Sequence, residues 1–298
     1  MDEMIRIDSV DVYNKLFGFE TRHPLITVVD LSEATRWPLR TKFAYGVYAL
    51  FLKDARCGDI KYGRKSYDYR DGTIVCFAPG QVVEVEMAPD TRPAGYGLLF
   101  HPDLIRGTAL GQEIRNYSFF SYETNEALHL SDEERQTIRD TLQKVEQELD
   151  HAIDKHSRRL ITANVGLLLD YCMRFYDRQF ITRSEVNSDI LTRFERLLDA
   201  YFDTDMQRQE GLPSVKYFAD KVFLSSNYFG DVIRKLTGMT ASEHIQNKVI
   251  DRVKEQLLSS DKTASQIAYE LGFQYPQHLS RMFKRITGLT PNEFRQQS

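Results

Sequence analysis

A segment that occurs twice near the C-terminal end is the feature that most restricts how this 298-residue chain can fold. Residues 233–243, IRKLTGMTASE, return fifty residues later as residues 283–293, FKRITGLTPNE. In each copy a Gly follows an apolar and basic run, and a Thr stands three residues before a Glu. Gly at such a place is typical of a helix end, and Thr followed by Glu is typical of the next helix start. We therefore expect the chain to build one helical unit twice.

The second copy predicts two short helices joined by a tight turn, with a third helix after them. Thr263 is a suitable N-cap for a first helix that ends at Gly272, where positive φ is needed. A second helix follows and ends at Gly288, and Thr290 caps the last one. Helical spacing puts the apolar residues of the second helix on one side and leaves a polar row on the other.

Two short amphipathic helices with such a polar row suit the major groove of DNA, which is just wide enough for an α-helix. We therefore predict a helix-turn-helix over residues 263–287, with double-stranded DNA as its partner. The alternative is a small helical subdomain whose polar row is an ordinary solvated face. The second copy of the unit favours DNA binding.

The first copy is expected over residues 214–237, with Ser214 capping its first helix and Ser225 or Ser226 capping its second. Gly230 weakens that second helix by about 1 kcal/mol relative to Ala. A linker helix over residues 241–258 should follow, about 27 Å long at 1.5 Å per residue. Such a rod would hold two recognition helices roughly one DNA turn apart.

We predict two sets of DNA-contacting residues. The base-reading candidates are polar residues of the two second helices, namely Gln277, His278, Arg281, Asn227, Asp231 and Arg234. The phosphate-binding candidates are Ser225, Ser226, Lys248, Lys284, Arg285 and Arg295. For each basic residue the alternative is a solvated surface charge. Because Asp231 and Gly230 lie in the first recognition helix, we expect the second to carry at least as much sequence specificity.

Charge and composition agree with a DNA-binding part inside a larger protein. The net charge is −4, yet residues 212–298 hold 12 Lys and Arg against 8 Asp and Glu. The length is suitable for about two domains. Cys57, Cys76 and Cys172 lack metal-like or disulfide-framework spacing, which favours a reducing compartment. No leader-like or membrane-spanning apolar stretch is present, so we expect a cytoplasmic protein without a membrane partner.

The N-terminal part has a different texture, with short apolar and aromatic runs separated by turn residues. We expect strands over residues 25–31, 43–52, 59–69, 73–79, 81–87 and 96–100, with turns at Cys57-Gly58, Asp71-Gly72 and Pro79-Gly80. Strands at this spacing predict a closed or jelly-roll barrel. Residues 1–19 are expected to form a short helical or extended arm.

The expected barrel has aromatic residues but no set of metal ligands. A catalytic metal needs three or four converging N and O ligands. His23 and His101 are far apart in sequence and each precedes a Pro, so we interpret both as structural. We expect no metal, no cofactor and no catalysed reaction. The candidates for a small-molecule pocket are aromatic, namely Trp37, Tyr45, Tyr48, Tyr67, Phe77 and Tyr96.

Two long helices are expected after the barrel, over residues 132–154 and 158–180. Ser131 and Glu134 form a capping box, and the apolar residues of the first helix follow at alternating steps of four and three. We predict that the two helices form a homodimer interface. The alternative is that both only cover their own barrel. Residues 182–189 are expected to be an interdomain linker.

Residues from about 190 to 298 resemble the DNA-binding domain of the AraC/XylS family of transcription regulators. The second copy carries this resemblance, through Ala268, Gly272, Phe273, Ser280, Arg281, Phe283, Lys284, Thr287, Gly288, Thr290, Pro291, Phe294 and Arg295. Residues 72–80, GTIVCFAPG, resemble the strand and turn of a cupin barrel. The resemblance implies a sequence-specific regulator, such as an activator, that binds promoter half-sites and has RNA polymerase as a further partner.

The expected fold is therefore α+β in two domains. Residues 1–181 would form a cupin-like effector-sensing and dimerisation domain, with the barrel at about 20–115 and the helices at about 132–180. Residues 190–298 would form an all-α domain with two helix-turn-helix motifs joined by a linker helix. Two other functions stay open. One is a regulator without a small ligand, controlled by a partner protein or by abundance; the other, less favoured, is a cupin enzyme fused to a DNA-binding domain.

Overall fold

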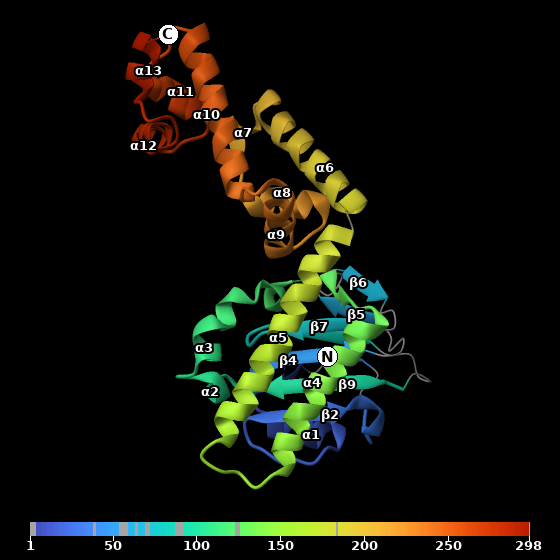
Figure 1. Ribbon diagram of the computed structural model, residues 1–298. Helices are drawn as coiled ribbons and strands as arrows, with labels where there is room; N and C mark the ends of the chain where they lie inside the picture. Colours follow the sequence, from blue (N-terminus) through green and yellow to red (C-terminus); the bar gives the residue numbers. More distant parts are fainter. Residues whose placement is uncertain are drawn as a thin grey trace. The chain divides into compact units, whose positions relative to one another are not determined.

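The structure is a computed structural model, and it describes residues 4–37, 40–53, 59–62, 65–68, 72–86, 92–122, 126–182 and 184–297. The chain divides into two compact units, Met1–Thr182 and Arg183–Ser298. In the residues that the structure describes, the first contains sheets and helices and the second only helices (Figure 1). The expected α+β class is confirmed.

The described strands of the N-terminal unit form two five-stranded sheets, with the orders β1-β3-β8-β5-β6 and β10-β7-β4-β9-β2. The strand pairs are antiparallel except for β1 with β3. The strands are β1 (Met4–Ile7), β2 (Ile26–Asp30), β3 (Arg40–Tyr45), β4 (Tyr48–Lys53), β5 (Asp59–Tyr62), β6 (Lys65–Asp68), β7 (Thr73–Phe77), β8 (Val82–Glu86), β9 (Gly95–Phe100) and β10 (Leu128–His129).

A closed barrel is not what the described strands form, and two expected strands are each divided. The run 43–52 becomes β3 and β4, which lie in different sheets. The corner is at Gly46, whose N–H donates to the Ile7 carbonyl oxygen at 2.9 Å. A Cβ at Gly46 would lie 3.1 Å from the Asp8 Cα, so the close approach of this backbone favours glycine. The run 59–69 folds back as the β5–β6 pair.

The core of the N-terminal unit contains aromatic side chains from both sheets. Phe43 and Val83 come from one sheet, and Phe51 and Phe77 come from the other. The expected arm is β1 followed by α1 (Val10–Phe17), and α1 adds Tyr13 to the same core. Burial of these side chains stabilises each by about 1.5–3 kcal/mol relative to exposure.

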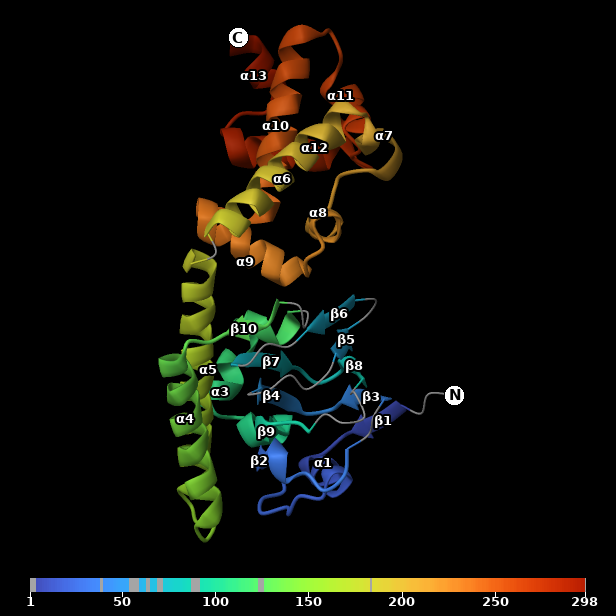
Figure 2. The same ribbon diagram turned by 90° about the vertical axis from the view of Figure 1, so that its right-hand side faces the viewer.

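Helices α4 (Asp132–Asp150) and α5 (Ser157–Thr182) cover the sheet that contains β4, β7 and β9 (Figure 2). The capping box of Ser131 and Glu134 is confirmed at the start of α4. The apolar stripe of α4, which suggested a dimer, is buried within this unit at Ile138, Leu142 and Val145. It therefore serves the alternative in which α4 covers its own sheets.

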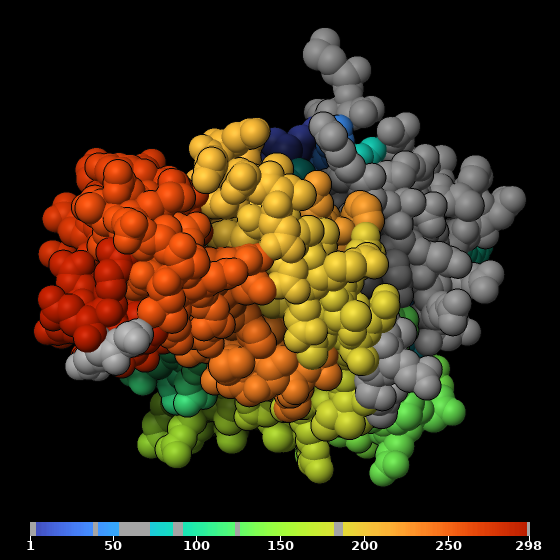
Figure 3. Space-filling view, turned by 90° about the horizontal axis from the view of Figure 1, so that it is seen from above, coloured from blue at the N-terminus to red at the C-terminus, as the bar shows by residue number. Residues whose placement is uncertain are grey.

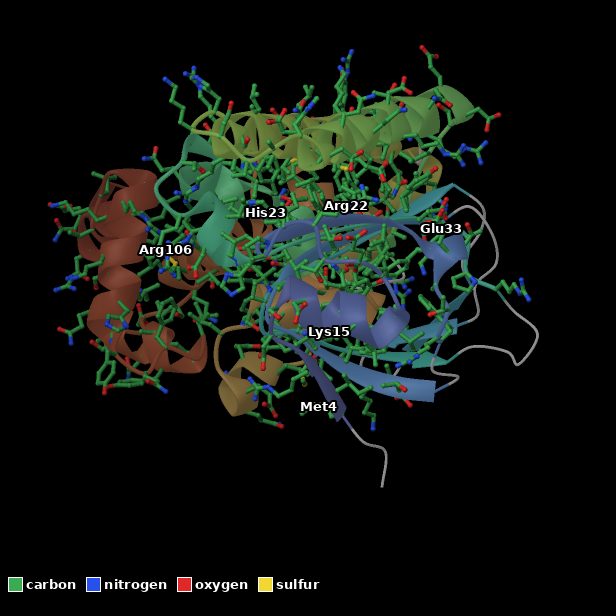
Figure 4. The ribbon with its side chains drawn as sticks, turned by 90° about the horizontal axis from the view of Figure 1, so that it is seen from below. Met4, Lys15, Arg22, His23, Glu33 and Arg106 are labelled. Atoms are coloured by element: carbon green, nitrogen blue, oxygen red, sulfur yellow. The ribbon has the colours of Figure 1, made fainter. Side chains whose placement is uncertain are left out.

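Shorter segments complete the N-terminal unit. They are α2 (Pro102–Ile105), α3 (Ala109–Glu113) and the 3-10 turns Leu31–Glu33, Ile114–Asn116 and Ser118–Ser121. Figure 4 shows Lys15 on α1, with Arg22 and His23 in the segment that follows. The Arg22 guanidinium donates to an Asp150 carboxylate oxygen at 2.7 Å and so ties this segment to the end of α4.

The C-terminal unit consists of eight helices in its described residues. They are α6 (Ser184–Asp203), α7 (Met206–Glu210), α8 (Val215–Val222), α9 (Ser226–Thr237), α10 (Ala241–Ser259), α11 (Ala264–Glu270), α12 (Pro276–Thr287) and α13 (Pro291–Gln297). Figure 1 shows α8 and α9 at one end of α10 and α11 to α13 at the other. A continuous core joins both ends along α10.

The expected linker over residues 182–189 is wrong for most of its length, because α6 begins at Ser184. The reason is that α6 is amphipathic further along: Phe194, Leu198 and Tyr201 are buried in the core of the C-terminal unit. Once that face is packed, the helix extends back over the polar residues before it. Among the described residues no helix is long and apolar enough to cross a membrane.

Candidate nucleic-acid interface

The second helix-turn-helix is formed by α11 and α12, and local hydrogen bonds fix both of its ends. The Thr263 hydroxyl accepts from the Gln266 N–H at 3.3 Å, and the Gln266 side chain accepts from the Thr263 N–H at 2.8 Å. Gly272 adopts φ of 85° after α11. The expected N-cap at Thr263 and the expected positive φ at Gly272 are confirmed. The chain turns at Gly272, and α12 follows.

Helix α12 has one buried face and one exposed polar face. Leu279 and Phe283 are fully buried against the core. Gln277, His278 and Arg281 are exposed. Within the described part of the chain, the side chains of Gln277 and Arg281 form no hydrogen bond or ion pair. Their donors are therefore available for base edges, where an Arg can make two hydrogen bonds to guanine.

Lys284 and Arg285 lie one turn further along α12 and differ in their surroundings. Both are exposed. The Arg285 guanidinium donates to the Gln246 side-chain oxygen at 2.7 Å and thereby joins α12 to α10. Lys284 lies near Glu293, whose pKa is lowered mainly by a hydrogen bond from the Thr290 backbone and to a smaller extent by the Lys284 charge.

The first helix-turn-helix is formed by α8 and α9. The Ser225 hydroxyl accepts from the Tyr228 N–H at 3.1 Å, so Ser225 is the N-cap of α9 and Ser226 is its first residue. Phe229 is buried in the core, while Asn227 and Arg234 are exposed on α9. Asp231 is half-buried. The polar row of α9 is thus less open than that of α12.

The turn between α8 and α9 contains Phe223, a residue that the sequence did not single out. Phe223 ends α8 with φ of 63° and is 60% exposed, although a bulky residue rarely adopts this conformation. The Arg193 guanidinium lies 5.7 Å from the centre of its ring. The position matches Gly272 in the second unit, and this match was the signal that could have identified it.

Two phosphate candidates have structural roles that the sequence did not reveal. The Arg295 guanidinium donates to the carbonyl oxygens of Leu257 at 2.9 Å, Ser260 at 3.3 Å and Lys262 at 2.6 Å. It therefore closes the end of α10, where carbonyl groups lack partners within the helix. Lys248 forms an ion pair with Asp199 of α6. Neither cation points freely to solvent.

Tyr275 is a further exposed residue beside the polar face of α12. It is 54% exposed, immediately precedes α12, and its ring lies 5.5 Å from that of His278 in a T-shaped arrangement. An aromatic residue in the turn before the recognition helix was the sequence signal. Its hydroxyl and ring add a second kind of contact surface to the amides and guanidinium of α12.

The aromatic candidates in the N-terminal unit are only partly brought together. Trp37, Tyr45 and Phe77 line a common cavity of about 30 Å³. Tyr48 is elsewhere, stacked on Phe100, and Tyr96 lies beneath the Arg139 guanidinium. Tyr67 belongs to β6, and its side chain lies outside what the structure describes, as does Cys57.

The two histidines that the sequence singled out in the expected barrel, His23 and His101, support local turns. His23 Nδ1 accepts from the Leu25 N–H at 3.1 Å, and burial lowers the pKa of His23. His101 Nδ1 accepts from the Asp103 N–H at 3.2 Å and caps α2. Among the residues that the structure describes, no group of three or more His, Cys, Asp or Glu side chains could hold a metal ion.

Comparison with known proteins gives one match that is located within the helical unit. Residues 218–297 match a family model described as a helix-turn-helix domain. The TetD protein of transposon Tn10 from Escherichia coli is 30% identical over 143 residues, which cover 48% of this chain and 91% of TetD. The uncharacterized transcriptional regulatory protein YesN of Bacillus subtilis is 35% identical over 85 residues, which cover 28% of this chain and only 23% of YesN.

A solved structure is similar to part of this chain. It is a transcriptional regulator from Chromobacterium violaceum described as containing an AraC-type DNA-binding domain. The sequences are 23% identical, and the similarity covers 37% of this chain and 92% of that chain with a TM-score of 0.32.

Proposed function

The chain belongs to the AraC family of transcriptional regulators, and on this basis we propose that it binds specific DNA sequences and regulates transcription. The observation that carries this proposal is the exposed polar face of α12, which holds Gln277 and Arg281, while Leu279 and Phe283 of the same helix are fully buried. The proposed partner is double-stranded DNA at promoter half-sites. RNA polymerase as a further partner and a cytoplasmic location are parts of the same proposal.

The proposed reading mode is one recognition helix per half-site. In this mode α12 enters one major groove and α9 enters the next, because the 19 residues of α10 span about 28 Å at 1.5 Å per residue. Gln277, His278 and Arg281 of α12 would contact base edges, together with Asn227 and Arg234 of α9. Asp231 would contribute least, because a half-buried carboxylate repels the phosphate backbone.

Phosphate contacts would come from the remaining cations and from the start of α9. Lys284 and Arg285 are both exposed, and Lys284 is the stronger candidate because the Arg285 guanidinium already donates to Gln246. Ser225 and Ser226 lie at the N-terminus of α9, where backbone N–H groups favour an anion. Lys248 and Arg295 are left out because their charged groups already have protein partners.

For the N-terminal unit we propose a cupin-like sensor of a small molecule. Two sheets that share an aromatic core support this assignment. The cavity lined by Trp37, Tyr45 and Phe77 measures about 30 Å³, far below the roughly 300–1,000 Å³ of typical ligand pockets. A ligand would therefore have to displace core side chains on binding.

The same small cavity favours a second candidate function, a regulator that is controlled by a partner protein or by its own abundance. Thermal-shift measurements on the full chain with a metabolite library separate the two. A saturable rise in melting temperature supports the sensor, and its absence across the library supports the alternative. Elemental analysis of pure protein tests the third possibility, a metal-dependent cupin enzyme, which requires bound iron, zinc or manganese.

We also propose a homodimer that uses the outer face of α5. Leu160 and Leu167 are 47% and 39% exposed and lie seven residues apart, which puts them on one face. Light scattering of the full chain at tens of micromolar tests this. We expect twice the monomer mass for the wild type and monomer mass for the Leu160→Glu, Leu167→Glu variant; a monomeric wild type would contradict the proposal.

The function itself is tested by selecting duplexes from a random DNA pool with the purified chain. We expect an enriched sequence that binds about 10³-fold more tightly than random DNA at physiological salt. A chain that enriches no sequence, or binds selected and random duplexes equally, would contradict the proposed function.

A further inference from the structure

Helix α7 precedes the first helix-turn-helix in the chain but contacts the second. The two meet at Gly272, in the turn between α11 and α12. A Cβ placed on Gly272 would lie 2.4 Å from the Gln207 carbonyl oxygen and 2.8 Å from the Gly211 carbonyl carbon. The two backbones therefore touch where only glycine leaves room. Figure 2 shows α7 beside α11.

Side chains on both sides of this contact hold α7 in place. The Tyr201 hydroxyl of α6 donates to the Gly211 carbonyl oxygen at 2.9 Å. The Arg208 guanidinium lies 3.6 Å from a Glu270 carboxylate oxygen of α11, which also accepts from Lys262 at 2.7 Å. Gln207 is only 4% exposed, and its amide donates to Asp205 at 3.1 Å. The contact is thus built from α6, α7 and α11 together.

Helix α6 connects this contact back to the first helix-turn-helix and to α10. Phe194 of α6 packs in T-shaped contact on Phe218 of α8 and on Phe229 of α9. Lys248 and Arg252 of α10 form ion pairs with α6, through Asp199 and Asp203 respectively. In Figure 3 the yellow atoms of α6 adjoin the orange atoms of α10.

The two recognition helices are therefore held by two connections. One is α10, and the other runs through α6 and α7 to the turn at Gly272. A single helix fixes the distance between the two helix-turn-helix motifs at its ends. It resists rotation of one motif relative to the other only through the contacts at those ends. A second contact away from the axis of α10 resists that rotation.

We propose that residues 205–211 form a brace that fixes the twist between the two recognition helices and so selects one separation between the two base blocks that the protein reads. The inference rests on the proposed function, because it concerns how two DNA-reading helices are spaced. It assigns α7 a part in specificity although none of the DNA-contacting residues proposed above lies on α7.

The experiment repeats the selection of duplexes from a random pool with two pairs of full-length variants. Gly272→Ala places a methyl group against the brace, and its control Gly288→Ala introduces the same backbone strain, at φ of 82°, with nothing within 4 Å of the new Cβ. Gln207→Ala removes a buried brace side chain, and its control Gln209→Ala removes an exposed side chain from the same helix.

We expect the wild type and both controls to enrich two base blocks at one separation. Gly272→Ala and Gln207→Ala should enrich the same blocks at two or more separations. Both variants should bind the duplex selected by the wild type about tenfold more weakly than the wild type does. For both variants, lengthening that duplex by one base pair between the blocks should change the affinity less than twofold. Thermal unfolding shows whether each variant is folded. If Gly272→Ala is not folded, the result for Gln207→Ala decides the proposal.

A single, unchanged separation in a folded Gln207→Ala variant would overturn the brace while the proposed function stands. A wild type that enriches no base block would overturn the proposed function and the brace with it. The two failures are therefore distinguishable.

Discussion

Phe223 and Gly272 hold equivalent places in the two helix-turn-helix units and adopt the same left-handed backbone conformation, with φ of 63° and 85°. Glycine accepts this conformation without a steric penalty, whereas a residue with a Cβ does so at a cost of roughly 1–2 kcal/mol. The first helix-turn-helix therefore carries backbone strain in its turn, and the second does not.

This strain predicts an unusual order of stability among substitutions at Phe223. Both Phe223→Gly and Phe223→Ala remove the ring and its contact with Arg193, but only Gly relieves the strained φ. We expect the Gly variant to be more stable than the Ala variant by about 1 kcal/mol in urea unfolding. Equal stability of the two variants would show that the turn is not strained.

Arg281 is predicted to read a base. Its exposed guanidinium has no protein partner among the described residues, so its removal should not disturb the fold. We expect Arg281→Ala to weaken binding to the selected duplex by about 1–3 kcal/mol and to relax preference at one base position. The measurement is a competition titration with single-base variants of the duplex. An equal loss on random DNA would rule out base reading.

Lys284 is predicted to contact a phosphate, since it lies on α12 beyond the base-reading residues and is exposed. We expect Lys284→Ala to weaken binding to all duplexes alike and to lower the slope of log K against log salt by about 1. Affinity measured between about 50 and 200 mM salt gives this slope. A sequence-dependent loss with an unchanged slope would assign Lys284 to base contacts instead.

The capping boxes at Glu243 and Glu293 predict an acid-dependent stability. Hydrogen bonds from Thr240 and Thr290 lower the pKa of each carboxyl below its ordinary value of 4.5. Because the pKa of each carboxyl is lower in the folded state, its ionised form stabilises the fold. This stabilisation is fully present above the unfolded-state pKa and is lost as the pH falls through the folded-state pKa. We expect Glu293→Ala to melt below the wild type at pH 7, with a smaller difference at about pH 3.

The matched control for that measurement is Asn292→Ala, which removes a neighbouring exposed side chain without a carboxyl group. Its difference from the wild type should not change with pH. A Glu293→Ala difference that stays constant from pH 7 to about pH 3 would contradict the capping role.

The local features of the helical unit could be predicted from sequence because a capping motif is complete within four residues. Thr240 with Glu243 and Ser131 with Glu134 specify their helix starts whatever packs around them. The turn at Phe223 could not be predicted in the same way, since its residue type argues against positive φ. There the packing of α8 and α9 overrides the preference of the backbone.

The remaining differences come from contacts between distant residues. The corner at Gly46 lies inside an uninterrupted apolar run and depends on the approach of Asp8. The roles of Arg295 and Lys248 depend on partners more than thirty residues away. Helix α7 is only five residues long, too short for a periodic pattern to reveal it.

The central claim is that two recognition helices read adjacent major grooves, and hydroxyl-radical footprinting of the full chain on its selected duplex tests it most directly. We predict two protected patches on one face of the duplex, separated by about 10 base pairs, with the patch over the α12 half-site lost in Arg281→Ala. A single patch, or uniform protection along the duplex, would contradict the account.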